Sequence, residues 1–201
     1  MFCLVTDRRR LSPGAVTFEP AQQRLAEQVT WATGANVDLI QVREPDLDAA
    51  RLAALVSRLV RVSRGSGTRV VVNDRGDVAL ACGADGVHLR HDSVPAEALR
   101  RIAPAGFLVG RSVHGVADAV LAGPVDYLIA GTVFSTPSKP AEAPILGLDG
   151  LAAIVRAVAV PVLAIGGITR ERFDEVAATG AAGVAGIGIF IDWFDRLDTP
   201  S

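Results

Sequence analysis

A chain of 201 residues, half of them apolar, can fold as one domain with a large core. Its formal net charge of −2 argues against a general nucleic-acid surface, which needs an excess of basic residues. The chain has no apolar stretch long enough to span a bilayer and no signal-peptide pattern, so the sequence predicts a cytoplasmic protein with no membrane partner.

Short runs rich in Val, Ile and Leu recur at a spacing that leaves room for a helix between strands. The predicted strands are Phe2–Thr6, Asp38–Arg43, Arg69–Asn73, Gly86–Leu89, Phe107–Ser112, Tyr127–Ala130, Val160–Ile165 and Gly183–Ile187. Most of them are continuously apolar rather than alternating, which is typical of parallel strands buried on both faces.

Stretches with helical periodicity lie between these strands. They are Pro20–Thr33, Leu47–Arg64, Gly76–Cys82, Pro95–Ile102, Val116–Leu121, Leu148–Val158 and Thr169–Thr179. The tail Phe190–Ser201 predicts a shortened last helix, whose incomplete cover of the last strand suggests a homodimer surface. The basic run Arg8–Arg10 is expected to be a solvated loop.

Eight strands with intervening helices predict an α/β fold, a small (β/α)₈ TIM barrel that forms a single domain over residues 1–201. The alternative is an open doubly wound sheet, but its usual glycine-rich first turn is absent, since Thr6-Asp7-Arg8 follows the first strand. In a barrel the active site lies at the carboxyl ends of the strands, so the polar residues there are the candidates for function.

Two polar residues end the second predicted strand. Gln41 and Arg43 are two positions apart and therefore share one face of the strand. An amide suits the reading of a ring, and a guanidinium suits phosphate oxygens. The alternative for Arg43 is an ion pair with Glu44 or Asp46.

Two further positions bear groups suited to phosphate chemistry. Asp74, after the third strand, offers a hard oxygen ligand for Mg²⁺, or else it caps the helix that starts at Gly76. Lys139 is the single lysine among 20 basic residues and lies beside Thr136 and Ser138. An ammonium with neighbouring hydroxyls can surround a phosphate, although chance also explains a lone lysine.

Glycines follow the seventh and eighth strands, at Gly166, Gly167, Gly186 and Gly188. Small residues there let backbone N–H groups approach a phosphate at a helix N-terminus, the recurrent phosphate site of barrels. The alternative is that they form ordinary tight turns.

The histidines predict no zinc site, because no third ligand appears at a metal-site spacing. His88 lies within a strand and reads as a core histidine. His114 follows Ser112 by two residues and is a candidate general acid or base, since histidine titrates near neutrality.

Seven motifs then stand in a characteristic order: Val5–Asp7, Gln41–Glu44, Val72–Arg75, Gly83–Leu89, Gly110–His114, Phe134–Lys139 and Ala164–Ile168. With them the chain resembles, over nearly its whole length, the thiamine-phosphate synthase family, which includes a related thiazole tautomerase. The synthase joins a pyrimidine methyl diphosphate to a thiazole phosphate and releases diphosphate, and the resemblance implies that activity here. The implied partners are these small phosphorylated substrates and Mg²⁺.

The resemblance implies a role for each matching position. Gln41 would contact the pyrimidine, and the diphosphate would be held by Arg43, Asn73, Ser112 and Lys139. Thr136 and Ser138 would contact the thiazole, and Gly167, Ile187 and Gly188 its phosphate. Asp74 would bind Mg²⁺.

Three positions depart from the synthase pattern. Pro45 stands where the family has a lysine, and Ser93 stands where it has a second carboxylate ligand for Mg²⁺. Gly188 stands where the family often has a serine. Asp92 is adjacent to Ser93 and would substitute as a metal ligand if the loop shifts. Two alternatives therefore stay open: a tautomerase that uses His114, and a non-catalytic sensor of phosphate ligands.

Overall fold

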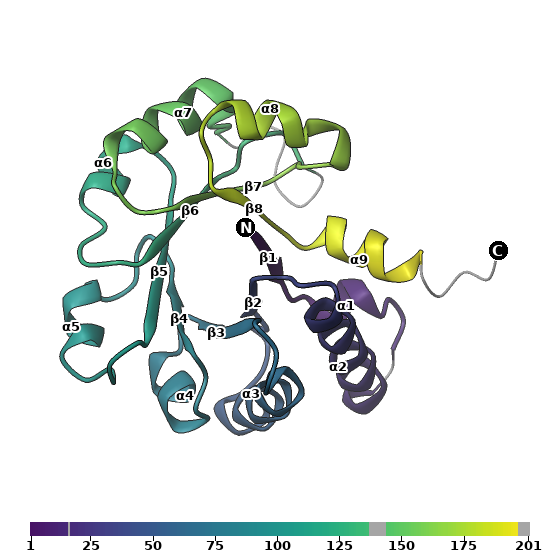
Figure 1. Cartoon of the computed structure of the whole chain (residues 1–201). Coiled ribbons are helices and arrows are strands. Elements are labelled where there is room, and N and C mark those ends of the chain that lie inside the picture. The colour runs from purple at the N-terminus through teal and green to yellow at the C-terminus, as the bar shows by residue number, and fades with distance from the viewer. Residues whose placement is uncertain (16, 137–143, 197–201) are drawn as a thin grey trace. The chain divides into compact units, whose positions relative to one another are not determined.

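The computed structural model describes residues 1–15, 17–136 and 144–196. Parallel strands β1 to β8 form a closed barrel in sequence order, so the predicted fold is confirmed. The strands are β1 Phe2–Val5, β2 Leu39–Val42, β3 Arg69–Asn73, β4 Gly86–Leu89, β5 Leu108–Val113, β6 Tyr127–Gly131, β7 Val162–Ile165 and β8 Gly183–Gly186 (Figure 1).

Helices occupy most of the connections between strands. They are α1 Arg8–Leu11, α2 Phe18–Gly34, α3 Ala49–Ser63, α4 Gly76–Ala81, α5 Ala96–Arg100, α6 Val116–Val120, α7 Gly147–Ala157, α8 Phe173–Ala178 and α9 Gly188–Asp195, with a 3-10 turn η1 Arg170–Arg172 before α8. The sequence predicted all of them except α1 and η1, the latter lying within the helix predicted from Thr169. In the described residues, none of these helices combines the length and the apolar character that a membrane crossing needs.

The helix α3 shows how the local sequence sets an element. Its buried positions follow the helical period, and they include Leu52, Leu55, Val56 and Leu59. The Asp48 carboxylate caps its N-terminus by accepting a hydrogen bond from the first turn. The strands follow a different rule, since β2 and β4 are buried at every position, including their polar residues Gln41 and His88, as expected for parallel strands covered on both faces.

The described residues of the barrel group into two compact units. The first contains residues 1–2 and 88–186, and the second contains residues 3–87 and the segment from Ile187 onward. The prediction of a single domain stays a prediction.

In the second unit, α9 packs against α2, which lies beside it in Figure 1. The ring centroids of Trp31 and Phe194 are 5.9 Å apart, and Arg24 forms a 2.6 Å ion pair with Asp195. Phe190 and Phe194 are buried, and among the described residues the exposed large apolar side chains do not come from α9. The short last helix is therefore confirmed, and the homodimer surface stays a prediction.

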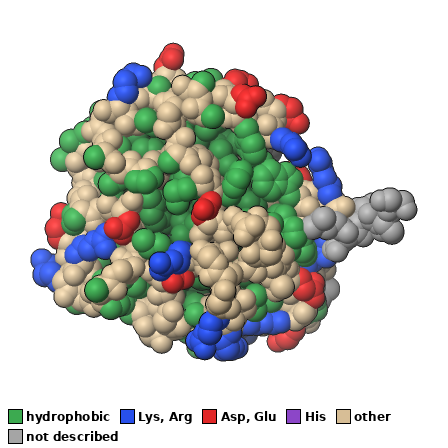
Figure 2. All heavy atoms as spheres, in the orientation of Figure 1, with side chains coloured by type: hydrophobic (Ala, Val, Ile, Leu, Met, Phe, Trp, Pro, Cys, Tyr) green, Lys and Arg blue, Asp and Glu red, His purple; other side chains and the backbone are tan. Residues whose placement is uncertain are grey.

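Charged side chains of both signs are mixed on the face drawn in Figure 2, where Lys and Arg side chains lie near Asp and Glu. This face therefore carries no broad basic patch in its described part, in keeping with the net charge of −2. The basic run after β1 is not the solvated loop that the sequence predicted. Its residues form α1, and Arg8 is buried while Arg9 and Arg10 are exposed.

Candidate functional site

A buried amide pair joins the ends of β2 and β3 in the second unit. The Gln41 Nε2 group donates a 2.8 Å hydrogen bond to Asn73 Oδ1. Gln41 is 4% exposed and Asn73 is half-buried, so the pair is largely shielded from water. Both were predicted substrate contacts, and the structure brings them together with a fixed orientation of each amide.

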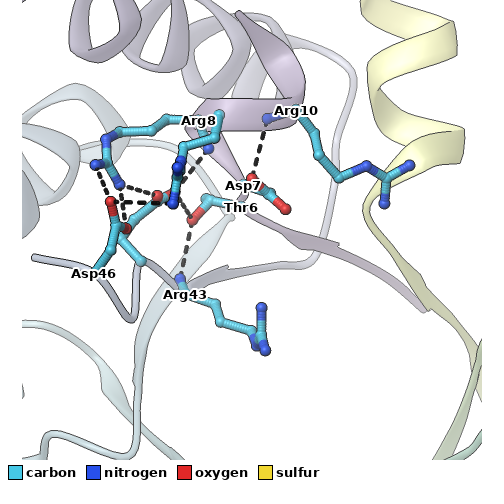
Figure 3. A network of polar contacts seen from close by, with 8 residues as sticks. Thr6, Asp7, Arg8, Arg10, Arg43 and Asp46 are labelled. Carbon is cyan, nitrogen blue, oxygen red and sulfur yellow. Dashed lines mark hydrogen bonds and ion pairs between the residues drawn. The ribbon is translucent and has the colours of Figure 1, made fainter. Parts of the chain in front are cut away.

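Figure 3 shows a network of polar contacts around Arg8 and Asp46. The Arg8 Nη1 group donates to Glu44 Oε2 at 2.7 Å, and its Nη1 and Nη2 groups donate to Asp46 at 2.7 and 2.5 Å. The side chains of Arg8 and Glu44 are only 9% and 2% exposed. Burial raises the pKa of the Glu44 carboxyl, and the bonds from Thr6 and Arg8 offset part of that rise.

This network holds the backbone at Arg43. The Thr6 hydroxyl donates to Glu44 Oε1 at 2.8 Å and accepts the Arg43 backbone N–H at 2.9 Å. The Arg43 side chain is exposed and points away from the network in Figure 3. Arg8 forms ion pairs with both Glu44 and Asp46, so the ion pair predicted as the alternative for Arg43 is not formed. Within the described part of the chain Arg43 has no ion-pair partner.

The backbone of Asp74 is left-handed, with a φ of 61°. Aspartate is one of the few residues other than glycine that adopt this region at modest cost. Arg75 rather than Asp74 occupies the N-cap of α4, so the capping alternative for Asp74 is wrong. The Asp74 residue is half-buried directly after β3.

The helix α9 begins where the sequence predicted a phosphate site. Ile187 occupies its N-cap and Gly188 is its first residue. Backbone N–H groups in a first helical turn have no partner within the helix and can bind an anion. A Cβ atom at Gly188 would lie 3.3 Å from Arg10 Nη2, so the Arg10 guanidinium reaches this terminus.

A second set of polar contacts in the first unit joins His88 of β4, Ser112 of β5 and Tyr127, the first residue of β6. The His88 ring is 1% exposed, and its Nε2 atom lies 2.9 Å from Ser112 Oγ. Its Nδ1 atom lies 3.1 Å from the Tyr127 hydroxyl. The prediction of a core histidine is confirmed, because both ring nitrogens have partners. Ser112 is half-buried, at the edge of this set.

Burial lowers the pKa of His88 from 6.5 to about 3, and the charge of Arg111 adds to this effect. Between these values the unfolded chain binds a proton that the folded chain does not, so stability falls as the pH falls from 6.5 toward 3.

From pH 6.5 to 5.0, His88 should lower the free energy of unfolding by about 1.5 kcal/mol. We therefore expect His88→Gln to show a smaller loss than the unsubstituted protein in urea titrations at the two pH values. Equal losses would contradict this prediction.

His114 lies just beyond β5 and is exposed. Its Nδ1 atom bonds the Gly131 carbonyl oxygen, which can only accept, so Nδ1 carries the proton. The Nε2 atom of the neutral ring then keeps a lone pair for proton transfer. The rings of His114 and His91 are 5.0 Å apart, edge to face.

In the loop after β4, Asp92 and Ser93 both contact Arg90 of the same loop. Asp92 is exposed and forms a 2.6 Å ion pair with Arg90, and the Ser93 hydroxyl accepts the Arg90 backbone N–H at 2.9 Å. Arg111 anchors the loop by donating to the carbonyl oxygens of His91 and Val94. The carboxylate of Asp92, which was predicted as a metal ligand, is therefore paired with Arg90. Among the described residues, no three His, Cys, Asp or Glu side chains form a group that could hold a metal.

Gly166 and Gly167 pack closely against the segment that follows β6. Both have left-handed φ values, 101° and 63°, and a Cβ at either position would lie 2.4 Å from an atom of Thr132 or of Ser135. Glycine is therefore required at both positions, because the backbone is left-handed there and lies too close to Thr132 and Ser135 to leave room for a side chain. Their contact with a phosphate remains a prediction.

Arg172 braces the same segment. Its guanidinium carbon lies 4.2 Å from the centroid of the Phe134 ring, and its Nη1 group donates to the Gly167 carbonyl at 2.7 Å. Thr136, a predicted thiazole contact, is half-buried at the end of the described segment. Ser138 and Lys139 lie outside the described residues.

Three sets of contacts in the two units were not predicted from the sequence. They are the Arg8 network, the contacts of His88 with Ser112 and Tyr127, and the bracing of the loop by Arg172. Arg8 follows the Thr6-Asp7 motif directly, which is the signal that could have been followed. His88 and Tyr127 are 39 positions apart, and nothing local relates them.

The fold and these side chains define the class: the chain is an enzyme of the (β/α)₈-barrel type, with polar groups at the carboxyl ends of its strands in each unit. The comparisons with known proteins place it further. The chain belongs to the thiamine monophosphate synthase family, whose model matches residues 4–190.

Individual relatives agree with this placement. The chain is 43% identical over 169 residues to the thiamine-phosphate synthase of Methanoregula boonei, covering 83% of this chain and 78% of that protein. It is 40% identical over 190 residues to that of Roseiflexus sp., covering 94% and 77%. A solved thiamine phosphate pyrophosphorylase from Pyrococcus furiosus is 31% identical and superposes with a TM-score of 0.78, covering 99% of this chain and 96% of that one.

Proposed function

We propose that this chain is a thiamine-phosphate synthase. It transfers the pyrimidinylmethyl group from its diphosphate to the nitrogen of thiazole phosphate. The carbon–oxygen bond to the diphosphate breaks, a carbon–nitrogen bond forms, and diphosphate leaves. Membership of the family over residues 4–190 supports this activity.

The observation that carries the proposal is the state of Arg43. Its backbone N–H is held by Thr6, and its exposed guanidinium has no ion-pair partner in the described ranges. The neighbouring carboxylates, which would otherwise neutralise it, are both taken by Arg8. A planar guanidinium with open donors suits a diphosphate.

The remaining roles follow from the chemistry of the reaction. Departure of diphosphate leaves a benzylic type of cation, so catalysis consists mainly of stabilising the leaving negative charge. We assign this to Arg43, Asn73, Ser112 and Lys139. Gln41, held by its bond to Asn73, would read the pyrimidine edge.

The thiazole substrate needs a fixed position for its nitrogen. Holding the two reactants close together and correctly oriented removes much of the entropic part of the barrier to a bimolecular reaction. We assign its ring to Thr136 and Ser138. Its phosphate is assigned to backbone groups at Gly166, Gly167, Ile187 and Gly188, the last two of which begin α9.

Asp74 fits a role as a Mg²⁺ ligand, since it is a half-buried carboxylate directly after β3. Mg²⁺ typically uses one or two protein carboxylates and takes its other ligands from substrate phosphates and water. Bound there, it would neutralise charge on the diphosphate. Asp92 fits less well, because Arg90 already occupies its carboxylate.

The test is to incubate the protein with both substrates, with and without Mg²⁺, and to measure released diphosphate. We expect release that requires both substrates and is strongly reduced without Mg²⁺. Binding of the substrates without diphosphate release would contradict the synthase and favour a phosphate-ligand sensor.

A second candidate, thiazole tautomerase activity, is favoured by His114, whose Nε2 atom is left with a lone pair by the bond from Nδ1 to Gly131. We expect His114→Ala to reduce tautomerase turnover by about 10²-fold, the typical share of a general acid or base, and to leave synthase turnover within about threefold. Parallel assays with the two sets of substrates decide this. Equal losses in both would remove the case for His114 as an acid or base.

Charged phosphate esters do not cross membranes unaided, so we place the reaction in the cytoplasm, where such substrates are retained. A homodimer stays a prediction, and light scattering that gives a monomeric mass would contradict it.

A further inference from the structure

His88 connects a buried phenol to a hydroxyl at the edge of the site. Its ring is 1% exposed, with Nδ1 3.1 Å from the Tyr127 hydroxyl and Nε2 2.9 Å from Ser112 Oγ. Tyr127 is 3% exposed, whereas Ser112 is half-buried. The three groups thus form a chain that runs from the core to a residue that can meet a substrate.

The register of β5 and β6 gives this chain its geometry. Tyr127 stands opposite Gly110 on the neighbouring strand. A Cβ atom at Gly110 would lie 2.1 Å from the Tyr127 ring, so only glycine leaves the space that the ring fills. The phenol is therefore held where its oxygen reaches His88, and Ser112 is two positions farther along the same strand as Gly110.

A neutral imidazole has one donor nitrogen and one acceptor nitrogen, so the chain can be polarised in two ways. Burial and the charge of Arg111 keep the His88 ring neutral, with a pKa near 3. If Nδ1 carries the proton, Ser112 must donate to Nε2 and shows only lone pairs to a ligand. If Nε2 carries it, Ser112 accepts from the ring and its own hydrogen is left for a ligand.

Two arguments favour the second arrangement. A phenol, with a pKa near 10, is a far stronger acid than a serine hydroxyl and is the better donor to a bare ring nitrogen. An anion also needs a donor, and lone pairs on Ser112 would repel it. Both place the proton on Nε2.

We propose that His88 is a positioning residue that sets the direction of the Ser112 hydroxyl: it accepts the Tyr127 hydrogen at Nδ1, donates from Nε2 to Ser112 Oγ, and so turns the Ser112 hydrogen toward the diphosphate. The inference rests on the proposed function for its ligand. The argument from the acidity of the Tyr127 phenol does not depend on that function, and the direction of the hydrogen bonds can be measured in the free protein.

The first test reads the tautomer of His88 directly, by ¹⁵N NMR of the full chain labelled at histidine, without substrates. The substitutions His91→Gln and His114→Gln assign the other two rings by removing their signals. We expect a neutral His88 ring from pH 8 to pH 5, with the proton on Nε2 and a bare Nδ1. A proton on Nδ1, or a doubly protonated ring at pH 6, would overturn the proposal.

The second test measures binding of inorganic diphosphate in the presence of Mg²⁺ by calorimetry. We expect Ser112→Ala to weaken binding about 10-fold and Tyr127→Phe about 3- to 10-fold, as loss of one hydrogen bond does. Tyr127→Phe should cause no further loss when Ser112 is already alanine. A loss of equal size in both backgrounds would show that Tyr127 acts on folding and not through Ser112.

The two tests separate this inference from the function on which it rests. Full diphosphate affinity in Ser112→Ala would show that Ser112 does not bind the diphosphate. The hydrogen bonds from Tyr127 through His88 to Ser112 would then have no role in the proposed reaction. The expected loss in Ser112→Ala together with a proton on Nδ1 would leave the synthase proposal intact and overturn the role of His88 alone.

Discussion

Replacement of Arg8 by methionine should lower the free energy of unfolding by about 3–5 kcal/mol, measured by urea titration at neutral pH. The substitution removes the guanidinium that meets both Glu44 and Asp46. Glu44, with a side chain only 2% exposed, would then keep a buried charge with only the Thr6 hydroxyl and a backbone N–H as partners. The loss of a partner for a buried charge costs far more than the pair itself contributes.

Arg69→Met is the matched control for this prediction. Arg69 forms a 3.3 Å ion pair with Asp85, but their side chains are 56% and 35% exposed, so the substitution should cost less than about 1 kcal/mol. The double substitution Arg8→Met with Glu44→Gln should recover part of the stability, since it removes the unpaired charge. A cost for Arg8→Met as small as the control would mean that Glu44 is not ionised beside Arg8.

The largest effects on activity are expected at Asp74 and Lys139. Asp74→Asn and Lys139→Ala should each reduce synthase turnover by about 10²-fold or more, because each removes a charge that the proposal directs at the departing diphosphate. Initial rates of diphosphate release at saturating substrates measure this. Unchanged turnover in both variants would overturn the mechanism.

Asp77→Asn is the control for Asp74, since Asp77 is three residues along, exposed, and paired with Arg75 at 2.6 Å. It should leave turnover unchanged. Lys139→Arg asks a finer question, because position 45 is proline here and supplies no second ammonium. Retained activity would show that charge suffices, and loss would show that a compact ammonium is required.

The barrel could be predicted because its signal is repeated and local. Continuous apolar strands and amphipathic helices recur along the whole chain, so errors at single boundaries do not change the fold. The helix α1 escaped prediction for the opposite reason. It has four residues, three of them arginine, and its stability comes from the Asp7 cap and from the buried partners of Arg8 rather than from periodicity.

The candidate site could be predicted only position by position. Gln41 and Asn73 were each expected to contact substrate, but their mutual bond depends on the register of β2 and β3. The partner of Glu44 was sought in Arg43, its neighbour in sequence, and is Arg8, 36 positions away. Long-range pairing of charges leaves no pattern in a single sequence, whereas the types of residue at strand ends do.

The network around Arg8 also affects the entropy of binding at Arg43. Fixing one residue of a mobile loop costs roughly 1–2 kcal/mol for the backbone alone. Here the Thr6 hydroxyl already holds the Arg43 N–H, and the Glu44 carboxylate holds Thr6. An anion that binds Arg43 therefore has to order only its side chain, so the network that stabilises this part of the fold also preorganises the contact.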